Sequence, residues 1–132
     1  MCNEPRKILS KARLDKAREC IADARRLYTK ESFNGAVNRS YFSVFHAMRS
    51  VLALDGFDSK RYSSITSEFQ RLYVKTGLLP KEFSNIIESA FNTQARSDYD
   101  DFYIISNCEV KQQIDNAGTF LAMIEKYLSE VS

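Results

Sequence analysis

The run Asn38-Arg39-Ser40-Tyr41-Phe42-Ser43-Val44-Phe45-His46 indicates a helical fold, and it places the only histidine of the chain seven residues after an arginine. Its apolar residues recur at the three- and four-residue spacing of an amphipathic helix. At about 100° and 1.5 Å per residue, seven steps leave Arg39 and His46 roughly 20° apart around the helix and about 10 Å apart along it. The two side chains are therefore predicted to share one helix face.

The helix around this run is predicted to cover residues 35–55, with Ser32 or Asn34 as its N-cap and Gly56 at its end. One stripe of this helix is apolar and is expected to face the core. It consists of Val37, Tyr41, Val44, Phe45, Met48, Val51 and Leu52. A second stripe on another flank mixes apolar and basic residues: Arg39, Phe42, His46, Arg49 and Ala53. Two such stripes predict a central helix.

Further helices are predicted over residues 6–30, 63–76 and 80–96. Gly77 ends the helix over residues 63–76, and Pro80 lies in the first turn of the helix that follows. The last helix begins at the capping box formed by Ser106 and Glu109, and its apolar residues keep a seven-residue repeat up to residue 131. The expected fold class is all-α, an up-and-down four-helix bundle with one additional short helix. Residues 1–132 are expected to form a single domain.

Composition favours long helices and gives no sign of a membrane protein. The 132 residues are 44% apolar and include only four glycines and two prolines. No apolar run approaches the roughly 18 residues of a membrane span, and the first residues lack the apolar core of a signal peptide. We therefore expect a cytoplasmic protein without membrane association. Its scattered cysteines, Cys2, Cys20 and Cys108, are expected to stay reduced.

Charge is distributed unevenly along the chain. Lys and Arg number nine against four Asp and Glu in residues 1–30, whereas residues 81–132 hold four against nine. Two interpretations remain open for the basic first helix. It either offers a positive strip to the phosphates of RNA, or it is a solvated surface balanced by the acidic last helix.

Several segments together resemble a known family. The run NRSYFSVFH resembles the arginine-to-histidine motif, with four to six intervening residues, of the HEPN superfamily of small all-helical bacterial and archaeal proteins. The segments ESFNGAVNRSYF, VKTGLLPKEF and ARSDYDDFY look like those of its small stand-alone branch, in the same order. The resemblance covers most of residues 8–131.

The resemblance implies a choice of functions. Families of this type supply metal-independent ribonuclease toxins, which need no cofactor, or are paired with a minimal nucleotidyltransferase that acts as antitoxin. It thus implies a toxin-like endoribonuclease, or a non-catalytic module that binds a nucleotide or a nucleotidyltransferase partner. A purely structural dimerisation domain is a third class. The chain departs from the family pattern in two places. The characterised toxins usually carry the arginine and histidine late in the chain, but no histidine follows Arg96 here. Related sequences often carry a histidine after the second helix, where this chain has Lys60-Arg61-Tyr62-Ser63.

The ribonuclease interpretation gives roles to two residues. His46 would transfer protons during attack by the neighbouring 2′-hydroxyl, and Arg39 would stabilise the charge on the phosphate. Because both Cα–Cβ bonds tilt toward the helix N-terminus, one helix does not bring both side chains onto a single phosphate. A two-fold homodimer would place Arg39 of one chain beside His46 of the other. Binding or supporting roles are predicted for Asn38, Tyr41, Arg96, Asp98 and Tyr99.

The alternative interpretation makes the same residues structural. His46 would then be a packed, hydrogen-bonded side chain among apolar neighbours, and Arg39 would pair with an acidic group such as Asp98. The acidic residues Asp98, Asp100 and Asp101 would either hold a magnesium ion bound with a nucleotide or lie in a solvated loop between helices.

Overall fold

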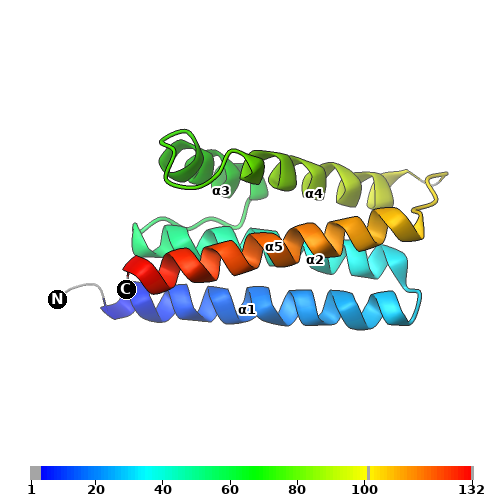
Figure 1. Ribbon diagram of the computed structural model, residues 1–132, viewed down its shortest axis with the longest axis horizontal. Coiled ribbons are helices and arrows are strands. Elements are labelled where there is room, and N and C mark those ends of the chain that lie inside the picture. Colours follow the sequence, from blue (N-terminus) through cyan, green and yellow to red (C-terminus); the bar gives the residue numbers. More distant parts are fainter. Residues whose placement is uncertain (1–3, 101, 132) are drawn as a thin grey trace.

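The computed structural model describes residues 4–100 and 102–131, and it shows an all-helical chain (Figure 1). Within these residues there are five α-helices and one π-helical turn. They are α1 (Glu4–Thr29), α2 (Phe33–Leu54), α3 (Tyr62–Phe69), the π-helical turn Gln70–Val74, α4 (Glu82–Tyr99) and α5 (Asn107–Val131). The predicted all-α class is confirmed. None of the described helices combines the length and the apolar character that crossing a membrane requires.

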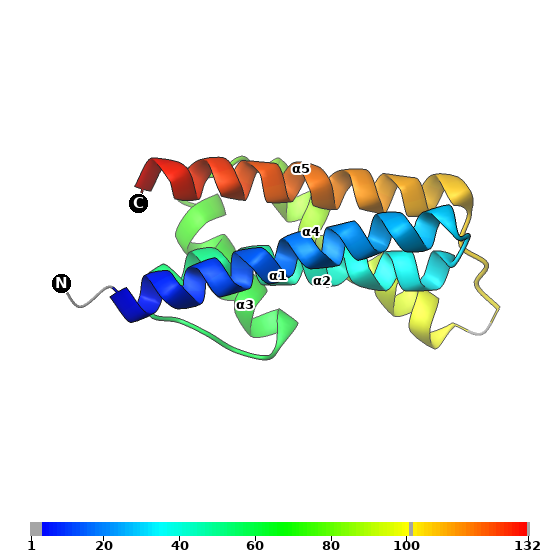
Figure 2. The ribbon, with the colours of Figure 1, turned by 90° about the horizontal axis from the view of Figure 1, so that it is seen from below.

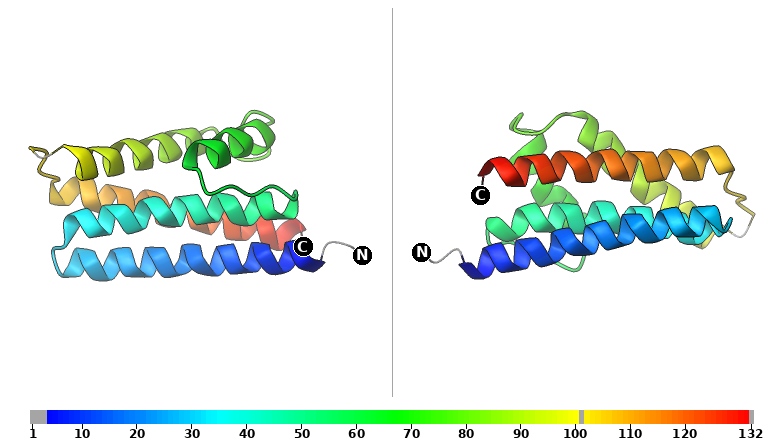
Figure 3. Two further views of the ribbon diagram at one scale, coloured as in Figure 1. Left: turned by 180° about the vertical axis from the view of Figure 1, so that it is seen from behind. Right: turned by 60° about the horizontal axis from the view of Figure 1, so that its bottom comes forward.

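Helix α2 occupies the central position that its two stripes predict, since it contacts α1, α3, α4 and α5. Consecutive long helices run in opposite directions, so the end of α4 lies at the same end of the molecule as the start of α2 (Figure 1). The start of α1 and the end of α5 both lie at the other end of the molecule (Figure 2). Seen from behind, α2 lies in front of α5, between α1 and the layer formed by α3 and α4 (Figure 3).

Small residues line the contact between α1 and α2 and let the two helices approach closely. The fully buried alanines among them are Ala17, Ala24, Ala36 and Ala47. The buried hydroxyl of Ser43 donates a hydrogen bond to the carbonyl of Ala17 at 2.9 Å. The hydroxyl of Ser10 donates to the carbonyl of Ser50 at 2.6 Å. Because these buried hydroxyls have backbone partners, they do not destabilise the contact.

A buried cluster of phenylalanines joins α3, α4 and α5. The Phe120 ring lies 4.5 Å from the Phe83 ring and 5.8 Å from the Phe69 ring, measured between centroids. None of the three is more than 2% exposed. Aromatic pairs at this spacing stabilise a core beyond the burial of their area. The cluster holds α3 and α4 against α5, which fixes where their outer residues lie relative to α2.

Most predicted helix ends agree with the structure. The capping box is confirmed, because the Glu109 amide donates to the Ser106 hydroxyl at 3.1 Å and the Ser106 amide donates to the Glu109 carboxylate at 3.2 Å. Gly56 and Gly77 take positive φ angles of 81° and 83°, which suits residues that end helices. Ser32 precedes α2, but its side chain makes no capping hydrogen bond.

Two segments differ from the prediction. Residues 63–76 do not form one helix, because α3 ends at Phe69 and the chain continues as the π-helical turn. Apolar spacing does not reveal this change, because the consecutive apolar residues Leu72, Tyr73 and Val74 suit either register, and the structure buries Tyr73 and Val74. The expected loop position of Asp98 is also wrong. Asp98 and Tyr99 lie in the last turn of α4.

Candidate functional site

Three half-buried residues, Arg39, Phe42 and His46, form a row along α2 that we call the α2 stripe. The guanidinium carbon of Arg39 lies 5.0 Å from the centre of the Phe42 ring. The centre of the His46 ring lies 6.2 Å from the centre of the Phe42 ring, and His46 is one turn further along the helix. Around the helix, Phe42 lies between Tyr41, which stacks on α3, and Ser43, which bonds to α1. The stripe therefore follows the side of α2 between α1 and α3.

The imidazole of His46 is neutral at pH 7. Burial, which removes the charged form from water, and nearby positive charges together lower its pKa to about 4, and burial has the larger effect. The charges belong to Arg49, Arg13, Lys16 and Arg39. The ring packs 5.3 Å from that of Phe45, and its buried Nδ1 atom has no hydrogen-bond partner among the described residues. The structural alternative expects a hydrogen-bonded histidine, and that bond is absent at Nδ1.

The guanidinium of Arg39 is oriented by a neutral neighbour. Its Nε and Nη2 atoms donate to Oδ1 of Asn38 at 3.2 and 2.7 Å. Within the described ranges it forms no salt bridge. The expected pairing with Asp98 is wrong, because Asp98 instead accepts a hydrogen bond from Gln94, one turn earlier in α4. An arginine held in this way keeps its charge available for a phosphate or another anion.

Arg49, which the sequence places on the same stripe, is a structural residue. Its Nε and Nη2 atoms donate to the two carboxylate oxygens of Asp58 at 2.8 and 2.9 Å. Arg13 of α1 donates to the same carboxylate at 3.0 Å. This triad ties the loop between α2 and α3 to both α1 and α2. The hydrogen bond from Arg49 lowers the pKa of Asp58 to about 2.

We expect Asp58→Asn to lower the stability of the fold in a pH-dependent way. The folded pKa of about 2 lies below the unfolded value near 3.9, so the carboxylate stabilises the fold above pH 4 and loses this effect as pH falls toward 2. The side chain is 35% exposed, and screening by water limits the effect to roughly 1 kcal/mol. Urea unfolding should show this difference between variant and parent at pH 7. A difference that stays constant between pH 4 and pH 2.5 would contradict it.

The predicted supporting residues on α4 fall into two groups. Arg96 turns toward the connection between α4 and α5, where its guanidinium lies 4.5 Å from the centre of the Tyr103 ring. Tyr41 of α2 instead lies near the end of α4. Burial raises the pKa of its phenol, and electrostatic interaction with Tyr99 and Asp98 raises it further. The structure therefore brings Tyr41, Asp98 and Tyr99 near one another beside the α2 stripe, while Arg96 makes its contacts elsewhere.

Residues from other helices complete the surroundings of the stripe, and reasoning from the sequence missed them. Arg13 and Lys16 of α1 act on the charge of His46, and Tyr62 of α3 stacks on Tyr41 at 4.6 Å. The sequence shows Arg13 and Lys16 only as members of a basic helix. A signal that would single them out requires knowing that α1 packs beside α2.

No group of three His, Cys, Asp or Glu side chains that could hold a metal ion exists in the described part of the chain. Asp101, which belongs to the predicted acidic cluster, and Cys2 both lie outside the described residues. Of the remaining cysteines, Cys20 is buried and Cys108 is exposed, and both are free thiols.

A comparison with protein families shows which family the chain belongs to. The family model described as the HEPN domain matches residues 10–127, a range that includes α2 with its stripe, α3 and α4. The chain belongs to the HEPN family. The resemblance noted from the sequence is thereby confirmed, and both Arg39 and His46 lie inside the matched region of this HEPN domain.

Curated relatives extend the comparison over nearly the full length of this HEPN domain. A protein of Thermotoga maritima named as a UPF0332 protein is 33% identical over 129 residues, which cover 98% of this chain and 97% of the relative. A protein of Methanocaldococcus jannaschii named as a "Putative toxin" is 28% identical over 115 residues, covering 87% of this chain and 78% of the relative. The chain is thus similar to archaeal and bacterial proteins, some of which carry a toxin name.

Proposed function

We propose that this HEPN domain is the toxin-like half of a toxin–antitoxin pair and acts on RNA as a metal-independent endoribonuclease. The observation that carries the proposal is the setting of His46, a half-buried imidazole that burial and four neighbouring positive charges keep neutral. One of these charges, on Arg39, is not neutralised by a carboxylate in the described residues. Such a site attracts a phosphodiester and offers it a proton acceptor.

The reaction follows from these two groups. His46 accepts the proton of a ribose 2′-hydroxyl as its oxygen attacks the adjacent phosphorus, and the bond to the 5′-oxygen of the next nucleotide breaks. The departing oxygen takes up a proton from water, which leaves a 2′,3′-cyclic phosphate and a 5′-hydroxyl. Arg39 stabilises the negative charge that builds up on the phosphoryl oxygens. The bound phosphate also offsets the surrounding positive charges, which raises the pKa of His46 and makes it a stronger base.

The arrangement on α2 favours a dimeric active site. Within one chain, the Phe42 ring lies between Arg39 and His46, and the two functional groups are two helical turns apart. We therefore propose a homodimer in which α2 helices meet antiparallel, so that Arg39 of one chain and His46 of the other contact the same phosphate. The underlying scaffold in this proposal is the up-and-down four-helix bundle with one additional short helix.

A nucleotidyltransferase-type antitoxin is the proposed partner. It would cover the α2 stripe and the nearby end of α4, since an antitoxin must block or modify the groups that perform the chemistry.

One observation favours the alternative of a non-catalytic module that binds a nucleotide or such a partner. The guanidinium of the late arginine, Arg96, lies over the Tyr103 ring and 3.5 Å from the carboxylate of Glu109. No histidine follows Arg96 in the sequence.

The proposal is tested by incubating the purified protein with a short labelled RNA in the presence of a chelator. We expect cleavage that yields 2′,3′-cyclic phosphate ends. The matched control strand carries 2′-O-methyl groups, which remove the attacking hydroxyl, and it should remain intact. Cleavage of the blocked strand, or cleavage only after metal is added, would contradict the mechanism. Absence of any cleavage together with measurable nucleotide binding would favour the non-catalytic alternative.

A further inference from the structure

Three aromatic rings from three helices form a ladder that leads from α2 to the outside of α4. The ring of Tyr41 stacks on that of Tyr62 at 4.6 Å, and Tyr62 stacks on Phe91 at 5.6 Å, with interplanar angles of 26° and 23°. The hydroxyl of Tyr62 donates to the carbonyl of Ile87 at 2.9 Å, which fixes the middle ring against α4. Phe91, the outer ring, is 47% exposed. The ladder therefore ends in a firmly held aromatic surface that water reaches.

The ladder is connected to the α2 stripe through Phe45. The Phe45 ring lies 5.3 Å from that of His46 and 5.8 Å from that of Tyr62. Three ring-to-ring steps of this size put Phe91 at most ~17 Å from His46. A single nucleic-acid strand spans this distance with roughly three to five nucleotides. The two features are close enough to contact one strand.

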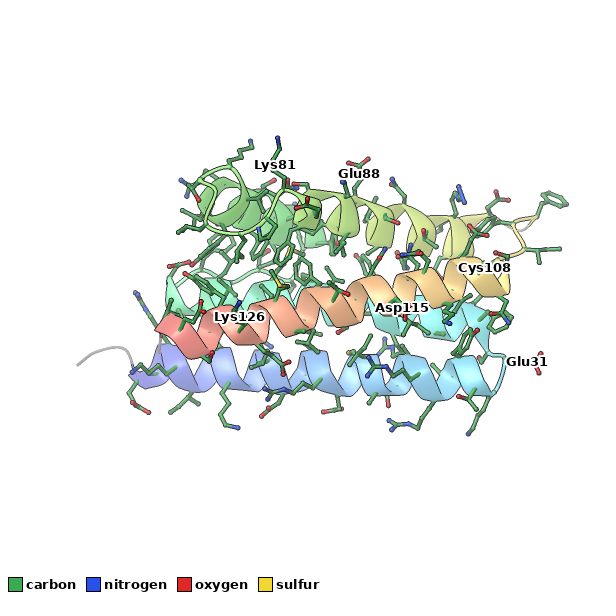
Figure 4. The ribbon with its side chains drawn as sticks, viewed as in Figure 1. Glu31, Lys81, Glu88, Cys108, Asp115 and Lys126 are labelled. Atoms are coloured by element: carbon green, nitrogen blue, oxygen red, sulfur yellow. The ribbon has the colours of Figure 1, made fainter. Side chains whose placement is uncertain are left out.

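A cleft of about 320 Å³ lies beside the outer ring, between α3 and α4. Tyr62, Ile87 and Phe91 form its apolar part, and Thr66 and Gln70 add polar groups. Glu88 is its only charged lining residue. Its side chain points outward from α4 (Figure 4). Because this cleft lacks a positive charge, it suits an uncharged planar group and disfavours a phosphate.

We infer that the cleft between α3 and α4 is a base-binding subsite, in which an unpaired RNA base stacks on Phe91 while a nearby phosphate of the same strand contacts the α2 stripe. The inference rests on the proposed ribonuclease function and specifies its substrate as single-stranded RNA. Base stacking on aromatic side chains is a general way to bind single strands, and a positive surface next to it follows the backbone. A duplex does not satisfy this site, because its bases are already stacked and paired.

The chain contains no tryptophan, which makes a direct test of the subsite available. Phe91→Trp introduces a single indole at the proposed stacking position. Its fluorescence should be quenched when a short single strand of 2′-O-methyl RNA, which is not cleaved, is added. The matched control is Phe102→Trp, at a residue that is 94% exposed in the connection between α4 and α5. Equal quenching of both indoles, or none at Phe91→Trp, would overturn the inference.

Affinity provides the second measurement. We expect Phe91→Ala to weaken binding of the same strand by roughly five- to a hundredfold, and Phe102→Ala to leave it unchanged. Phe91→Tyr should restore most of the affinity, since it keeps the stacking ring. The inference fails if Phe91→Ala binds as the parent does, or if a duplex of the same sequence binds as tightly as the single strand. Cleavage that depends on His46 would then still support the proposed function, so the two failures are distinguishable.

Discussion

Replacing His46 with alanine should lower the rate of RNA cleavage in chelator by at least about a hundredfold, because it removes the group that accepts the 2′-hydroxyl proton. Arg39→Ala should lower the cleavage rate by a similar factor, because the negative charge of the transition state is no longer stabilised. Combining the two substitutions should add little, since the proton acceptor and the positive charge act as one unit. Cleavage of a labelled RNA under single-turnover conditions measures all three rates.

The matched control for Arg39 is Arg26→Ala. Arg26 is an exposed arginine of α1 that pairs with Asp23 within the same helix, so its loss should leave cleavage unchanged. Circular dichroism should show the parent helix content in every variant, because Arg39 and His46 are only half-buried. Activity that survives His46→Ala in a folded protein would exclude the imidazole as the base. Equal losses in Arg26→Ala and Arg39→Ala would indicate general electrostatic attraction of RNA.

Mixing the two inactive variants should restore activity if the site is shared between chains. In a dimer of one Arg39→Ala chain and one His46→Ala chain, one site loses both groups and the other keeps both. Random exchange of equal amounts therefore gives about a quarter of the parent activity, against almost none for either variant alone. The measurement is the cleavage rate after the variants have been mixed and allowed to exchange subunits.

Recovery of this kind is not expected from a site built within one chain, because every chain in the mixture lacks one of the two groups. Light scattering at tens of micromolar supplies the independent measurement of size, and the proposal requires a dimer. A monomer, or a dimer without recovery, would remove the shared-site mechanism. It would leave Arg39 and His46 as separate groups on one surface.

The main helix boundaries could be predicted because they depend on neighbouring residues. The Ser106 and Glu109 capping box, for example, is a local exchange of two hydrogen bonds, and it occurs where the sequence places it. The π-helical turn after Phe69 could not be predicted in this way, since the same apolar spacing suits an α-helix. Arg49 shows that prediction from the sequence has the same limit for the candidate site. Helix periodicity places Arg49 on the same stripe as Arg39, but its hydrogen bonds to Asp58 in the following loop give it a structural role.

The sequence by itself determined that Arg39 and His46 lie on one side of a central helix, because that relation depends only on the rise and rotation of a single helix. Tertiary structure decided the properties of the side chains. Packing against α1 brings Lys16 near His46, and burial with these charges keeps the imidazole neutral. The contacts of α3 and α4 likewise build the aromatic ladder that ends at Phe91. Periodicity shows which face of a helix is buried, but only the packed structure shows which distant residues lie against it.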